Sequence, residues 1–99
     1  MPDPAGRTEN RDLLTVAVEL YSLDTHTPAQ RGFTQNVSPR GARVVTGRSW
    51  QPNDRLHIKS LRGDLRSNAR VVYCQPLADD SFAIGLELVT PAGNWGARR

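Results

Sequence analysis

The segment Leu-Thr-Val-Ala-Val-Glu-Leu-Tyr, residues 14–21, is the stretch that specifies the fold most clearly. A large aliphatic residue stands at every second position, at 14, 16, 18 and 20. Side chains on a β-strand point alternately to opposite faces, so this pattern places all four aliphatic residues on one face. We therefore expect a strand with one face buried in a core.

Five further segments with strand-like patterns follow, separated by residues that favour turns. They span residues 31–37, 42–46, 55–61, 65–77 and 82–88. No part of the chain has convincing helical periodicity over ten or more residues. Six short strands joined by tight turns predict an all-β fold, an antiparallel barrel or sandwich, because closing a sheet removes its exposed edges.

The two ends of the chain lack these patterns. Residues 1–12 contain Pro2, Pro4 and Gly6 with mixed charges, which predicts a flexible N-terminal arm. Residues 91–99 predict a short C-terminal tail without a helix. A chain of 99 residues has room for one core, so residues 13–90 are expected to form a single domain.

The charge and apolar content of the chain limit the kinds of ligand and location that we expect. The chain carries a net charge of +3, and Lys59 is its single lysine, so arginine supplies nearly all of the basic residues. Arginine's planar fork matches phosphate oxygens and the N7/O6 edge of guanine. No apolar run is long enough for a membrane span or a secretory signal, and Cys74 has no disulfide partner. A cytoplasmic protein without membrane insertion is expected.

Residues suited to catalysis or metal binding are few. His26 falls in a turn, and His57 alternates with buried positions of its strand, so both are interpreted as surface residues. Asp79 and Asp80 stand together in a turn, where carboxylates are common. The sequence therefore predicts a protein that is not an enzyme and has no metal or cofactor.

Two motifs remain that suit a phosphate-containing ligand. The first, RTENR at residues 7–11, places Arg7 and Arg11 four positions apart on the arm. The second, NVSPRG at residues 36–41, forms a polar turn in which Asn36 and Ser38 project to the same side. We expect Gly41 to adopt a backbone geometry closed to other residues.

This pair of motifs resembles the signature of the PilZ family of cyclic di-GMP receptors, RxxxR followed by [D/N]xSxxG. Residues 52–56, 69–73 and 84–88 resemble further strands and turns of that family, so the likeness covers most of residues 7–89. The resemblance implies a six-stranded antiparallel barrel. Three departures from the family pattern are Gly6 in place of an arginine, Pro39 within the turn, and a C-terminal tail without the helix that often packs beside the barrel in this family. Asn36 is the amide form of a position where many relatives carry a carboxylate.

Carried over residue by residue, the resemblance implies a cyclic di-GMP site. Arg7 and Arg11 would fold across the phosphates and guanine faces of the ligand. Asn36 and Ser38 would form hydrogen bonds with a guanine edge or a phosphate, and Gly41 would keep the site free of a side chain. Ligand binding would order the arm and present a new surface to an unidentified partner protein.

Two alternatives stay open at this point. A PilZ-like domain that does not bind nucleotide could act through protein contacts alone, with Trp50 or Trp95 as an exposed anchor. A nucleic-acid-binding barrel would suit the basic charge. It is disfavoured because the six aromatic residues are scattered and form no stacking row.

Overall fold

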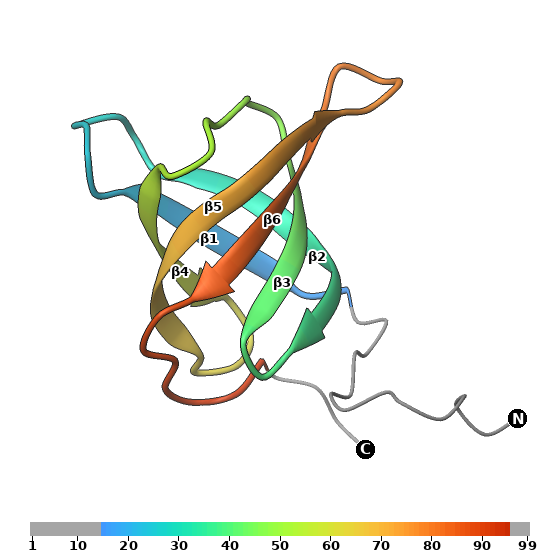
Figure 1. Cartoon of the computed structure of the whole chain (residues 1–99). Helices are drawn as coiled ribbons and strands as arrows, with labels where there is room; N and C mark the ends of the chain where they lie inside the picture. Colours follow the sequence, from blue (N-terminus) through green and yellow to red (C-terminus); the bar gives the residue numbers. More distant parts are fainter. Residues whose placement is uncertain (1–14, 96–99) are drawn as a thin grey trace, which may run out of the picture.

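Alternating apolar residues produce six strands in the computed structural model, which describes residues 15–95 (Figure 1). The strands are β1 (Ala17–Ser22), β2 (Gln30–Ser38), β3 (Gly41–Thr46), β4 (Arg55–Ser60), β5 (Arg66–Pro76) and β6 (Phe82–Leu88). The predicted number and order of strands are confirmed, and most boundaries agree within one residue. The main difference lies in β1, which begins at Ala17, whereas the pattern starts at Leu14, outside the described residues.

The strands close into an antiparallel barrel in the order β1-β2-β3-β6-β5-β4. Two three-stranded meanders, β1-β2-β3 and β4-β5-β6, meet along the pairs β3–β6 and β1–β4. Each strand therefore has two hydrogen-bonded neighbours, and the sheet has no free edge to pair with other chains. The choice between barrel and sandwich, which periodicity left open, is settled in favour of the barrel.

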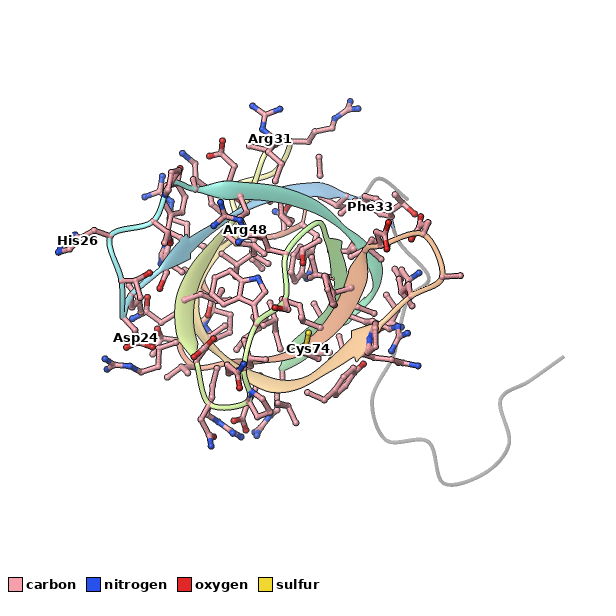
Figure 2. All side chains as sticks on the ribbon, turned by 90° about the horizontal axis from the view of Figure 1, so that it is seen from above. Asp24, His26, Arg31, Phe33, Arg48 and Cys74 are labelled. Atoms are coloured by element: carbon pink, nitrogen blue, oxygen red, sulfur yellow. The ribbon has the colours of Figure 1, made fainter. Side chains whose placement is uncertain are left out.

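The core is formed by the inward side chains of all six strands. Its fully buried aliphatic residues are Val18, Leu20, Val44, Leu56, Ile58, Val71 and Ile84. Figure 2, a view from above, shows side chains filling the ring of strands, with Cys74 inside it and His26 pointing away. Residues 15–95 contain no helix of the length and apolarity that a membrane span requires.

The connection from β3 to β4 crosses one mouth of the barrel, because β4 lies on the far side of the sheet from β3 (Figure 2). Trp50, in this connection, is only 8% exposed and belongs to the hydrophobic core. Its backbone N–H donates to the Cys74 sulfur at 3.5 Å. The prediction that Trp50 is an exposed interaction anchor is therefore wrong: the indole closes the barrel mouth.

The chain beyond β6 returns to the start of β5. Ala92 and Arg66 exchange backbone hydrogen bonds of 2.8 and 2.9 Å, and Leu65 donates to the Asn94 carbonyl at 2.8 Å. Trp95 is half-buried against the core, and its carbonyl accepts a hydrogen bond from Ser60 Oγ. Trp95 is thus less available to a partner than the tail assignment predicted.

Replacing Ile84 tests the core assignment. Ile84→Ala should lower the free energy of unfolding by about 2–5 kcal/mol, because it removes buried methylenes and leaves a cavity. Val89, which is 60% exposed just after the same strand, provides the matched control. Val89→Ala should change the unfolding free energy by less than about 0.5 kcal/mol in the same urea titration. Equal losses for the two variants would contradict the assignment.

Candidate functional site

Asn36, Ser38 and Gly41, the three described residues of the predicted site, lie together where β2 turns into β3. Ser38 pairs with Gly41 across the turn, and its hydroxyl donates a long 3.4 Å hydrogen bond to the Gly41 carbonyl. All three residues line one surface hollow of about 170 Å³. We call these three residues the Asn36 corner.

Asn36 faces outward because β2 contains a bulge. Thr34 is fully buried, and strict alternation would bury Asn36 two positions later. The pairing with β3 shifts between Thr34 and Asn36, so Gln35 is an extra residue in β2. A bulge re-aims the side chains that follow it, and here it turns Asn36 to the outside while Val37 points inward. The Asn36 side-chain amide makes no hydrogen bond to any residue in 15–95.

Gly41 is needed for a reason other than the predicted one. Its φ angle is not positive, so it does not use the conformational freedom of glycine, and that expectation is wrong. Instead, a Cβ atom at this position would lie 2.7 Å from the backbone oxygen of Leu86 on β6. Glycine thus allows β3 and β6 to approach closely at the corner.

Arg43 and Tyr73 line the same hollow and were not identified from the sequence. Asn36 pairs with Arg43, Arg43 with Gly85, and Gly85 with Tyr73, so one cross-strand row runs over β2, β3, β6 and β5. We call it the Arg43 row. Arg43 could have been found by counting two positions on from Gly41 along the same face.

A second bulge ends this row. Val71 is fully buried, yet Tyr73, two positions later, is exposed, because the pairing of β5 with β6 shifts between them. The extra residue, Val72, also lines the hollow. Tyr73 therefore lies on the outer face, as Asn36 does at the other end of the row.

The charges around the hollow differ between neighbouring rows. Glu87 lies opposite Gly41, and Arg70 neutralises it through hydrogen bonds of 2.8 and 3.1 Å to the same carboxylate oxygen. Within residues 15–95, Arg43 in contrast donates only to neutral groups: Gln35 Oε1 at 2.7 Å, the Tyr73 hydroxyl at 2.9 Å and Gln75 Oε1 at 3.2 Å. The hollow therefore carries a positive charge that favours an anionic ligand.

Two carboxylates outside the hollow, Asp24 and Asp79, have lowered pKa values. No group of three or more His, Cys, Asp or Glu side chains comes together as a metal site among residues 15–95. Hydrogen bonds from the Arg55 backbone and guanidinium lower the pKa of Asp24, and a hydrogen bond from Ser81 lowers the pKa of Asp79. A general acid at neutral pH requires the opposite shift.

Arg7 and Arg11 lie outside the described residues. The described chain begins next to β2, however, close to the Asn36 corner. The backbone N–H of Val16 donates to Thr34 Oγ1 at 2.8 Å, and its carbonyl accepts from the Thr34 N–H at 2.9 Å. Thr34 is only two positions before Asn36.

Comparison with known proteins identifies the family. The PilZ domain model matches residues 6–94, which is nearly the whole chain and includes both arginine positions. This chain belongs to the PilZ domain family. PilZ domains are non-catalytic receptors, typically for cyclic di-GMP, which agrees with the prediction that the chain is not an enzyme.

A solved structure is similar to this PilZ barrel. It is that of the Bacillus subtilis inhibitor of motility, MotI/DgrA, with a TM-score of 0.70 and 20% sequence identity. The alignment covers 93% of this chain and 49% of that one, so the present chain spans about half the length of the similar structure. At this identity the likeness shows a shared fold. No curated protein sequence matched the chain.

The close approach at Gly41 predicts the effect of adding a methyl group. Gly41→Ala should cost about 1–3 kcal/mol of unfolding free energy, because the Cβ atom displaces the backbone of β6. Gly47 provides the matched control, since a Cβ there meets nothing within 4 Å. Thermal and urea unfolding should therefore leave Gly47→Ala within about 0.5 kcal/mol of the unmodified protein. A Gly41→Ala variant as stable as Gly47→Ala would refute this role for the glycine.

Proposed function

We propose that this PilZ domain is a cyclic di-GMP receptor whose N-terminal arm, residues 1–12, closes over the Asn36 corner when the ligand binds. The barrel, residues 13–90, supplies the fixed half of the site, and residues 91–99 are the tail that follows it. Arg7 and Arg11 supply the other half. The observation that carries the proposal is the place and direction in which the chain leaves β1.

β1 runs antiparallel to β2, with Ala17 opposite Phe33 and Val16 bonded to Thr34. At Val16 the backward direction of the chain therefore points along β2 toward Asn36 and Ser38. An extended chain spans about 3.4 Å per residue, so Arg11 has a reach of about 17 Å from Val16 and Arg7 of about 30 Å. Asn36 is only about 7 Å along β2 from Thr34, so both arginines can reach the corner.

The chemistry of the two halves is complementary to a cyclic dinucleotide. Two guanidinium forks on the arm suit two phosphates, and they can also stack on the guanine faces. The Asn36 amide, which has no hydrogen-bond partner among residues 15–95, can both donate and accept at a guanine edge, and the Ser38 hydroxyl can donate to a phosphate or to a base. The positive charge of Arg43 favours the same dianionic ligand.

Signalling follows from the ordering of the arm. An arm fixed over the corner in the bound state presents a different surface from an unbound arm, and a cytoplasmic partner protein would recognise that surface. The partner is not identified. The rival proposal of a protein-interaction domain without nucleotide loses its suggested anchors, because Trp50 is buried and Trp95 packs against the core.

Alanine replacement of the arm arginines tests the proposal. Arg7→Ala and Arg11→Ala should each weaken cyclic di-GMP binding by roughly 10- to 150-fold, because a hydrogen bond to a charged group contributes roughly 1.5–3 kcal/mol. Isothermal titration calorimetry measures the affinities. Both variants should unfold at the same urea concentration as the unmodified domain.

Arg48→Ala is the matched control, because Arg48 is exposed and follows β3 at the end away from Gly41. It removes the same charge without touching the corner, and the affinity should be retained. An unmodified domain that fails to bind cyclic di-GMP, or arm variants that bind as tightly as Arg48→Ala, would reject the receptor function.

A further inference from the structure

Three hydrogen bonds hold Arg43 in one orientation. Among the described residues, Gln35, Tyr73 and Gln75 accept from three of its five N–H donors, one on each nitrogen. The two remaining donors are one on Nη1 and one on Nη2. Each of these two N–H groups can donate to an acceptor on a ligand.

Gly85 allows Tyr73 to hold Arg43 in place. A Cβ atom at Gly85 would overlap the Tyr73 ring, so the ring lies directly over the glycine of β6. The Arg43 guanidinium carbon is 5.8 Å from the centroid of that ring, and the Tyr73 hydroxyl accepts from Arg43 Nη1. Tyr73 therefore holds the guanidinium in two ways, through the contact with its ring and through the hydrogen bond to its hydroxyl.

Arg43 lies beside the residues proposed to bind the ligand. Arg43 is the direct cross-strand neighbour of Asn36 and lines the same hollow as Ser38 and Gly41. Its partners are all uncharged, so no carboxylate has to be displaced before it can bind a ligand. Arg70 in the next row differs on this point, because its guanidinium is committed to Glu87.

We propose that Arg43 determines the base specificity of the site by donating to O6 and N7 of a guanine, with Tyr73 as its positioning residue. This inference rests on the proposed receptor function. Guanine presents two adjacent acceptors on that edge, whereas adenine presents N7 beside an amino group that is itself a donor. A fixed arginine fork therefore favours a guanine dinucleotide over an adenine dinucleotide.

Arg43→Lys provides the test, because it keeps the positive charge and removes the fork. Calorimetry with cyclic di-GMP and cyclic di-AMP gives the ratio of the two affinities. In Arg43→Lys that ratio should fall by about 5- to 150-fold, the range expected for one bidentate contact to a base. Arg48→Lys, at the other end of β3, should leave it unchanged. If cyclic di-AMP binding is too weak to measure, the affinities of the two variants for cyclic di-GMP are compared instead. Arg43→Lys should then bind cyclic di-GMP more weakly than Arg48→Lys.

Tyr73→Phe is the second variant, since it keeps the ring over Gly85 and removes the hydroxyl that accepts from Arg43. It should lower the ratio in the same direction by a smaller factor. This variant also serves if Arg43→Lys fails to fold.

The outcomes separate the two proposals. A domain that binds neither dinucleotide fails as a receptor altogether. If cyclic di-GMP binds but Arg43→Lys and Tyr73→Phe keep the ratio of the unmodified domain, only the role of Arg43 is overturned. An equal loss of affinity for both dinucleotides overturns it too, because that result indicates general attraction of anions rather than recognition of guanine.

Discussion

Two β-bulges are the constraint on which the candidate site depends. Strict alternation would bury Asn36 on β2 and Tyr73 on β5, because Thr34 and Val71 two positions earlier are both inside the barrel. One extra residue in each strand, Gln35 and Val72, reverses this. The bulges stand at opposite ends of the Arg43 row, so they place its two end residues, Asn36 and Tyr73, on the outer face beside Arg43.

The arginines of this face are distinguished by their partners. Arg55 forms an ion pair with Asp24, and Arg70 forms an ion pair with Glu87 and a hydrogen bond with Asn53. A carboxylate therefore neutralises the positive charge of each of these two arginines. In the described part of the chain, Arg43 bonds only to neutral side chains. The abundance of arginine in the sequence therefore says little about binding by itself, and the pairing of each arginine decides whether its charge is available to an anion.

Much of the fold could be predicted from residue patterns, whereas the site could be predicted only in part. Period-two alternation specified six strands, because one face of each strand must be buried. Alternation could not reveal the bulges, nor that Trp50 fills a barrel mouth, since both depend on contacts between distant strands. The motif pointed to the three residues of the Asn36 corner but gave the wrong reason for Gly41. Glycine is needed there because a Cβ atom would be too close to the Leu86 carbonyl oxygen, and not because the residue has a positive φ angle.

The central claim is that the N-terminal arm and the Asn36 corner meet around one ligand. A spin label attached at residue 9, between Arg7 and Arg11, measures this directly through paramagnetic broadening of backbone amide signals. On addition of cyclic di-GMP, the account predicts new broadening at Asn36, Ser38 and Arg43, and none at Arg48. Ligand binding with no new broadening at the corner, or with broadening centred on Arg48, would contradict it.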